Sequence, residues 1–139
     1  MRKLRYRTLL LFLFSLVLAG NPVRIEASPV DTLTAKTVAE IFYGSKTQHL
    51  RSAAPSATQL VYTATLPANR AGGNLNAFYV FNIGSGFVMV AADDRVQPVL
   101  AYSLEDSFQA EGMPANIRFF LKEYVDEIAL IVSDPTMAE

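Results

Sequence analysis

Residues 78–103 contain three runs typical of β-strands, with almost no spacer between them. The runs are rich in aromatic and β-branched side chains, which favour strands. A glycine-serine-glycine turn separates the first two runs, and a corner with two aspartates and a proline separates the last two. This stretch therefore predicts the centre of one antiparallel sheet. Its strands are expected at residues 78–82, 87–92 and 99–103.

The flanking segments add a fourth strand and a long C-terminal helix. Residues 58–66 alternate in polarity and predict an edge or second strand. Pro114 is tolerated in the first turn of a helix, and apolar side chains recur after it at spacings of three and four. These side chains are Ile117, Phe120, Leu121, Tyr124, Ile128 and Ile131.

An amphipathic helix is expected earlier in the chain, over residues 31–43, with Gly44 as its end. Val38, Ile41 and Phe42 share the face expected against the sheet, and Thr32 or Thr34 is the expected cap of the first turn. The predicted fold class is α+β: an antiparallel sheet of about four strands with two packed helices.

The N-terminus predicts a signal peptide in residues 1–27. Basic side chains precede an uncharged run of ten residues, which is too short to cross a bilayer as a helix. Cleavage after Ala19 and cleavage after Ala27 are both compatible with the sequence. We therefore expect residues 28–139 to form one exported domain, periplasmic or secreted, without membrane contact after cleavage.

Charge and cysteine content limit the class of partner. From residue 28 onward, seven Lys and Arg are set against twelve Asp and Glu, a formal charge of −5, which argues against nucleic acid. The chain has no cysteine, so it must fold on its apolar core without disulfides. An apolar fraction of 51% over 139 residues is sufficient for such a core.

Few side chains could carry catalysis or hold a metal ion. With no cysteine and His49 as the single histidine, no Cys-His pair and no thiolate zinc site can form. Ser85 lies directly between two glycines, which is not the spacing of a nucleophile elbow. Adjacent Asp93 and Asp94 would point to opposite faces of an extended chain, so turn chemistry explains them better than an acid/base pair. We expect an exposed His49, no enzymatic activity, no cofactor and no metal.

Five segments follow one another at defined intervals within residues 78–131. They are FYVFNIGSGFVMVAADDR at 78–95, PVLAYS at 98–103, SF at 107–108, NI at 116–117 and YVDEI at 124–128. This ordered set resembles the proregion of streptopain-type cysteine peptidases and the Spi-type proregion-like inhibitors encoded beside those enzymes. It departs from the family pattern at Ala101, where glycine is common. The resemblance implies a small domain that docks on the peptidase, blocks its active-site cleft and holds the catalytic residues apart.

Two functions from different classes remain open at this point. The first is inhibition of a streptopain-family cysteine peptidase, either by a free inhibitor or by the truncated proregion of such a precursor. The alternative is a secreted, non-enzymatic binding or surface module unrelated to proteolysis, which the bare sequence features allow equally. The sequence does not identify the peptidase or the affinity.

The resemblance also implies a contact site within residues 112–117. It places Asn116 where a proregion asparagine reaches into the active site and helps to displace the catalytic histidine, with Met113, Pro114 and Ala115 as further contacts. The chemistry is compatible, because a helix start leaves backbone donors unpaired and an amide side chain both donates and accepts. An Asn116 that caps the helix, or that is simply an exposed first-turn residue, fits the sequence equally well.

Overall fold

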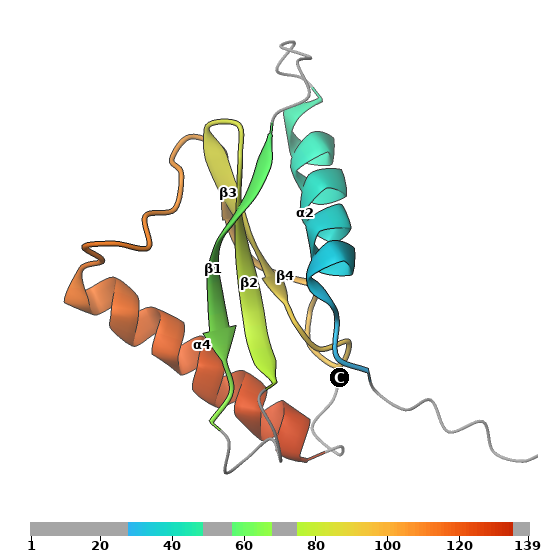
Figure 1. The fold of residues 1–139 in the computed structure, drawn as a ribbon, viewed down its shortest axis with the longest axis vertical. Coiled ribbons are helices and arrows are strands. Elements are labelled where there is room, and N and C mark those ends of the chain that lie inside the picture. Colours follow the sequence, from blue (N-terminus) through green and yellow to red (C-terminus); the bar gives the residue numbers. More distant parts are fainter. Residues whose placement is uncertain (1–27, 49–56, 68–74, 135–139) are drawn as a thin grey trace, which may run out of the picture.

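A four-stranded antiparallel sheet with one helix on each face forms the fold (Figure 1). The computed structural model describes residues 28–48, 57–67 and 75–134. Along the chain the elements are α2 (Thr32–Thr47), β1 (Thr58–Thr65), β2 (Asn76–Ile83), β3 (Gly86–Ala91), β4 (Val99–Ser103) and α4 (Ala115–Ser133). The strands lie in the order β1-β2-β3-β4, so each strand pairs with the next one along the chain. The predicted α+β fold class is confirmed.

The four predicted strands are all present, and their ends differ from the prediction by at most two residues. β4 spans the expected residues 99–103, whereas β2 is longer than the expected residues 78–82. The extension occurs because Asn76 and Ile83 both have partners in β1. Pairing with a neighbouring strand, rather than side-chain type, therefore sets these ends.

The β2-β3 hairpin needs both of its glycines, for different reasons. Ile83 pairs with Gly86, which leaves Gly84 and Ser85 as a two-residue turn. Gly84 has the positive φ that the sequence predicts for this turn, +59°. Gly86 does not have a positive φ, and a Cβ there would lie 2.1 Å from the backbone oxygen of Ser103. Its role is to let β4 approach closely.

The sheet is buried on both faces, which explains why its two central strands are almost continuously apolar. Phe78 and Val80 of β2 belong to the core beneath α4, together with Ile128. Tyr79 and Phe81 alternate with them and belong to the core beneath α2. The side-chain period of two along β2 therefore divides its residues between two separate cores.

The first helix begins with an aspartate cap in place of the expected threonine. Asp31 is the N-cap, and its carboxylate accepts hydrogen bonds from the backbone amides of Leu33 and Thr34. The expected cap at Thr32 or Thr34 is wrong, because the aspartate one residue earlier reaches these donors. Its hydrogen bonds to the amide and hydroxyl of Thr34 hold the pKa of Asp31 below its ordinary value.

The buried face of α2 is centred beside the expected one. Ala35, Ala39 and Tyr43 are buried at spacings of four, Val38 and Phe42 of the expected face pack partly buried against the same core, and Ile41 is 68% exposed. Small alanines let the helix approach the sheet closely, which leaves Ile41 outside the contact. The helix also continues through Gly44 to Thr47, because Gly44 has ordinary helical geometry and no positive φ.

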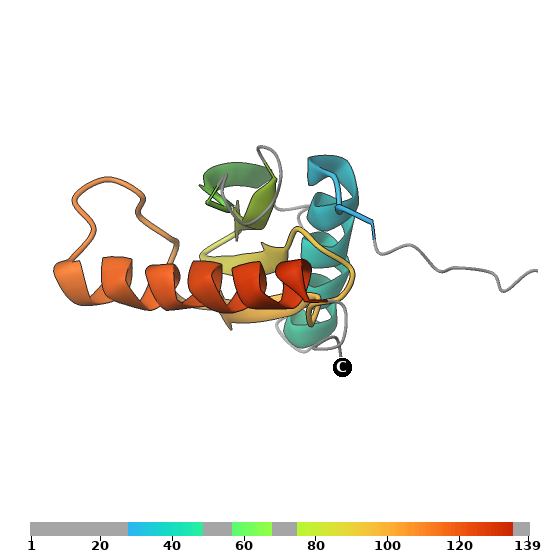
Figure 2. The same cartoon turned by 90° about the horizontal axis from the view of Figure 1, so that it is seen from below.

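Helix α4 is amphipathic only from its second turn onward. Leu121, Ile128 and Ala129 are buried against the sheet, as the periodicity predicts for the first two. Ile117 and Phe120 were expected in the same buried face but are 38% and 52% exposed. The reason is positional: the first turns of α4 project beyond the sheet, and the segment that faces them is the loop that leads from β4 into the helix (Figure 2).

Some predictions lie outside the described residues. These are the signal peptide at residues 1–27 and the exposed position of His49. No helix in the described ranges combines the length and the apolar composition needed to cross a membrane.

A pair of glycine substitutions tests the close approach of β4 to Gly86. Gly86→Ala should lower the free energy of unfolding by about 3 kcal/mol, because the new methyl group meets backbone atoms that cannot rotate away. The control is Gly44→Ala, where nothing lies within 4 Å of the new Cβ. It should raise stability by about 1 kcal/mol through helix propensity. Urea unfolding measures both, and equal effects would contradict the assigned role of Gly86.

Candidate functional site

The loop that leads from β4 to α4 is fixed at one point by an asparagine side chain. Asn82 in β2 donates from its Nδ2 to the Phe108 carbonyl at 3.1 Å and accepts from the Phe108 amide at 2.8 Å. The Phe108 ring contacts Tyr62 and Phe87, each at 5.7 Å between ring centroids. Phe108 therefore anchors the loop. The matching role of Asn82 was missed, and its only signal was an amide within an apolar strand.

The loop enters α4 through a short, well-defined turn. Gly112 has a φ of +66°, and Met113 after it is buried in the core beneath α4. Pro114 is the N-cap with a φ of −58°, so it lies one position before the first turn in which it was expected. Ala115 and Asn116 follow as exposed residues of that first turn. Because Met113 is buried, it fixes how far the exposed start of the helix lies from the core.

The structure distinguishes between two of the interpretations of Asn116. Pro114 occupies the cap position, so the interpretation of Asn116 as the cap is wrong, and Asn116 is an exposed first-turn residue. No side chain caps this helix start. The backbone donors of the first turn, with the positive end of the helix dipole, therefore point away from the domain next to a free amide side chain.

An apolar surface surrounds this helix start. Ile117, Phe119 and Phe120 are exposed, Phe119 to 65%. Phe120 packs edge-to-face against Tyr124, with 5.0 Å between ring centroids. A pocket of about 390 Å³ lies on the inner side of the helix and is lined in part by Met113. Phenylalanines in water are unfavourable in a free domain, which makes this surface a candidate interface.

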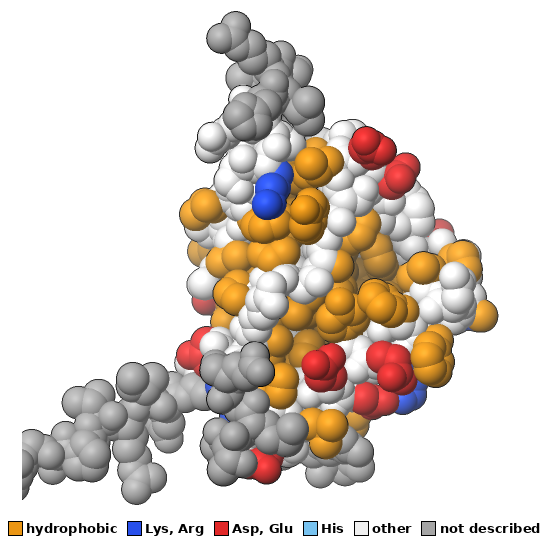
Figure 3. Space-filling model, turned by 180° about the vertical axis from the view of Figure 1, so that it is seen from behind, with side chains coloured by type: hydrophobic (Ala, Val, Ile, Leu, Met, Phe, Trp, Pro, Cys, Tyr) orange, Lys and Arg blue, Asp and Glu red, His pale blue; other side chains and the backbone are white. Residues whose placement is uncertain are grey.

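The opposite end of α4 borders a second hollow. An open pocket of about 440 Å³ lies between the helix and β4, lined by Leu100, Tyr124, Ile128 and Ile131 among others. Figure 3, which views the molecule from behind, shows hydrophobic side chains across the middle of this face with acidic side chains below them. Helix α4 therefore rests on the sheet with open space beside it at both ends.

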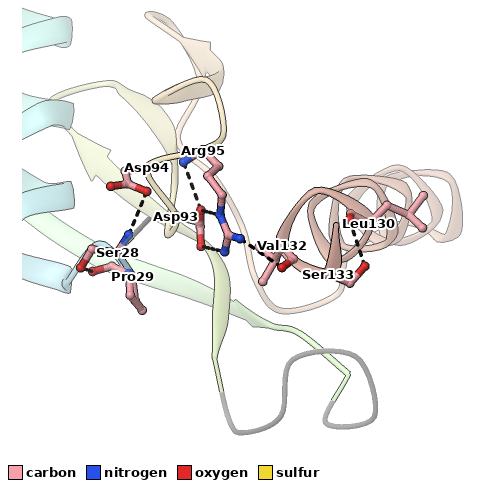
Figure 4. Close-up of polar contacts among 8 residues, drawn as sticks. All are labelled: Ser28, Pro29, Asp93, Asp94, Arg95, Leu130, Val132 and Ser133. Carbon is pink, nitrogen blue, oxygen red and sulfur yellow. Dashed lines mark hydrogen bonds and ion pairs between the residues drawn. The ribbon is translucent and has the colours of Figure 1, made fainter. Parts of the chain in front are cut away.

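The corner between β3 and β4 contains a buried ion pair (Figure 4). The Arg95 guanidinium donates from Nε to Asp93 Oδ1 and from Nη2 to Asp93 Oδ2, both at 2.8 Å. Asp93 is only 4% exposed. The same guanidinium donates from Nη1 to the Val132 carbonyl of α4 at 3.1 Å. The two aspartates form a turn as predicted, but the ion pair was not predicted, because spacing alone does not show that Asp93 is buried.

The electrostatics of this corner follow from its geometry. Burial opposes ionisation of Asp93, but hydrogen bonds from the Arg95 side chain and amide, with the positive charge of Arg95, outweigh it and hold the pKa of Asp93 below its ordinary value. The hydrogen bonds to Asp93 likewise raise the pKa of Arg95. Next to this pair, Asp94 accepts a hydrogen bond from the Ser28 amide at 3.0 Å. The corner therefore joins the segment before α2 to the end of α4.

Within the described ranges, no three His, Asp, Glu or Cys side chains gather into a group that could hold a metal ion.

Comparison with known proteins first defines the class: this α+β unit is a proregion-like protease-inhibitor domain. Residues 27–128 match the model of the Spi protease inhibitor family, and the chain belongs to that family. The resemblance inferred from the central stretch is thereby confirmed.

Two curated relatives are proteases. The chain is 35% identical over 111 residues to the thiol protease/hemagglutinin PrtT of Porphyromonas gingivalis, covering 78% of this chain and 12% of that protein. It is 30% identical over 129 residues to streptopain of Streptococcus pyogenes, covering 91% of this chain and 31% of that protein. The chain thus spans less than a third of the length of either relative. No solved structure gave a match.

The lowered pKa of Asp93 gives a test of the corner. A carboxylate with a depressed folded pKa stabilises the fold fully above its unfolded pKa of about 3.9, and this stabilisation is lost as the pH falls through the folded value. Asp93→Asn should therefore cost about 3 kcal/mol at neutral pH. The difference from the unsubstituted protein should shrink as the pH falls below about 4.

Urea unfolding of both proteins across this pH range measures the difference, and the contribution of Asp31 cancels because both proteins contain it. A difference that stays constant with pH would show that the ionised form of Asp93 is not what stabilises the corner.

Proposed function

We propose that this chain binds a streptopain-family cysteine peptidase and blocks its active-site cleft, with the start of α4 as the inserted segment. The observation that carries the proposal is the helix start itself, which projects past the sheet, has no side-chain cap and lies within an exposed apolar surface. Membership of the Spi protease inhibitor family supports inhibition. The similarity to PrtT and streptopain supports a cysteine peptidase as the partner.

Asn116 is the residue proposed to enter the cleft, flanked by Pro114 and Ala115. Its amide can donate to and accept from polar catalytic groups, and the unpaired backbone donors of the first turn lie beside it. Met113, the further contact, is buried in the core beneath α4 and supports the segment from that side. Because Ala115 and Asn116 are already helical, they do not offer the extended backbone that a peptidase cleaves. Such a segment blocks the cleft without becoming a substrate.

The apolar side chains beside Asn116 are proposed to supply most of the binding energy. Phe119 and Phe120 together expose two aromatic rings on the projecting part of α4. Aromatic side chains buried at the centre of an interface are common sources of affinity. In this arrangement, Asn116 occupies the active-site cleft, and the neighbouring phenylalanines supply most of the binding energy.

We extend the proposal to export, with residues 1–27 as the signal peptide and residues 28–139 as the mature domain. The supporting pattern is a basic N-terminal segment followed by a short apolar run. An N-terminus of the exported protein at position 20 or 28 would support this division, and retention of residues 1–27 would contradict it.

Asn116→Ala tests the inserted segment. The substitution should raise the inhibition constant by a factor that corresponds to about 1–3 kcal/mol, because polar groups of the cleft lose their partner. Stability should change by less than about 0.5 kcal/mol, since Asn116 is exposed and is not the cap. The assay uses the streptopain-family peptidases of the source organism, with Thr37→Ala on the opposite helix as the control.

An inhibition constant unchanged by Asn116→Ala would remove Asn116 from the site. Failure of the unsubstituted chain to inhibit any of these peptidases would favour the alternative, a binding module unrelated to proteolysis.

Substitution of two exposed apolar residues, one on each helix, tests whether the apolar surface of α4 binds the peptidase. Phe119→Ser should weaken binding by about 2 kcal/mol or more, as expected for an aromatic anchor. Leu33→Ser on α2 should leave binding unchanged, although Leu33 is even more exposed, at 73%. Calorimetric titration of the peptidase measures both. Equal losses would indicate non-specific apolar contact instead of a defined surface on α4.

A further inference from the structure

The apolar contacts that hold α4 lie from Leu121 onward. Three of its 19 residues, Leu121, Ile128 and Ala129, are buried, and Tyr124, Val125, Ile131 and Val132 pack partly buried against the same core. Pockets of about 390 and 440 Å³ flank it, so the sheet does not support it evenly. Two polar contacts supplement this packing: Tyr124 Oη donates to the Leu100 carbonyl at 3.3 Å, and Arg95 donates to the Val132 carbonyl at 3.1 Å.

The contact from Arg95 lies at the end of the helix opposite Asn116. On an ideal helix Val132 lies about 6 Å and Asn116 about 18 Å from the buried Ile128, so a shift of about 0.7 Å at Val132, with Ile128 as the pivot, moves Asn116 by about 2 Å. Displacements of about 1 Å are enough to disrupt a catalytic or inhibitory geometry. Small changes at Val132 are therefore amplified at the site.

Arg95 is itself held rigidly. Two of its nitrogens contact the buried Asp93 carboxylate, and its backbone amide donates to Asp93 Oδ1 at 3.1 Å. The chain around Asp93 is fixed from the other side of the sheet, because Pro29 forms a β-bridge with Asp93 and the Val30 amide donates to the Ala92 carbonyl at 2.8 Å. The position of the guanidinium is therefore fixed relative to the sheet and to the segment that leads into α2.

The end of α4 is suited to this contact. The last carbonyls of a helix have no partner within the helix and carry the negative end of its dipole. The last turn of α4 contains no basic residue of its own. Arg95 supplies that positive charge from the sheet, and only a planar guanidinium can bind a carboxylate with two nitrogens while a third nitrogen reaches a carbonyl.

We infer that Arg95 is a positioning residue: by bridging Asp93 and the Val132 carbonyl, it sets the direction of α4 and places Asn116 for the peptidase. The inference rests on the proposed function, because Asn116 matters only if the start of α4 enters the cleft. Its structural part, that Arg95 fixes the helix direction, stands independently of any peptidase.

The structural part is tested by measuring a distance across the domain. The full chain has no cysteine, so Thr37→Cys and Ala115→Cys accept one spin label each, on α2 and on the start of α4. Pulsed electron resonance should give one narrow distance distribution. Addition of Arg95→Lys keeps the positive charge but removes the planar guanidinium. This change should broaden or shift the distance distribution. An unchanged distribution would overturn the inference.

The functional part is tested by inhibition, in proteins without labels. Arg95→Lys should raise the inhibition constant about tenfold while the protein remains folded at the assay temperature. The control is Val90→Ala, which removes volume from the core beneath α2 and lowers stability without touching α4. It should leave the inhibition constant and the label distance unchanged. Equal loss of inhibition in both variants would show that Arg95 acts through stability alone and would overturn the inference.

If Arg95→Lys does not fold, Asp93→Asn replaces it, because the amide keeps one acceptor for the guanidinium; the same changes are expected at a temperature low enough for this variant to remain folded. Failure of the proposed function is recognised separately: the unsubstituted chain would not inhibit, while the label distance would still respond to Arg95→Lys.

Discussion

Burial of the β2-β3 hairpin on both faces is the constraint on which the rest of the structure depends. Alternate side chains of β2 enter two different cores, so one helix is needed on each face. Without disulfides, the domain must obtain its stability from these two cores. The hairpin in turn requires Gly86, since β4 packs against it at backbone distance. A one-residue slip in register would exchange the two sets of side chains and leave neither helix with its matching surface.

The two helices use the sheet differently, and the difference separates stability from function. Helix α2 lies close to its face through Ala35 and Ala39. Helix α4 covers its face only in part and extends beyond it, with exposed phenylalanines at its free end. A long helix anchored at one end presents a rigid projection to a partner, provided that its direction is fixed. The contacts that fix it are the buried Leu121, Ile128 and Ala129 of the helix, together with the Asp93–Arg95 pair, Tyr124 and buried Met113.

Most of the fold could be predicted from the sequence, because strand composition and glycine turns are local signals. The residues missed were those whose roles depend on distant partners. Asn82 binds a loop 26 positions away, and Arg95 reaches a carbonyl 37 positions away, so neither role has a local pattern. Periodicity also placed Ile117 and Phe120 in the core, because it reports a helix face but not the extent of the surface beneath it. The position of Asn116 came from the family resemblance, and the structure added that it is exposed and does not cap the helix.

The central claim is that this domain closes the active site of a cysteine peptidase. Because the chain has no cysteine, iodoacetamide added to the complex reports only on thiols of the peptidase. The most direct measurement is the rate at which the catalytic cysteine is alkylated with and without a saturating amount of the full chain. A closed cleft predicts that bound chain slows alkylation by at least about a hundredfold, in line with tight exclusion of small reagents. An alkylation rate that is unchanged in a complex shown to have formed would contradict the claim and place the binding surface away from the active site.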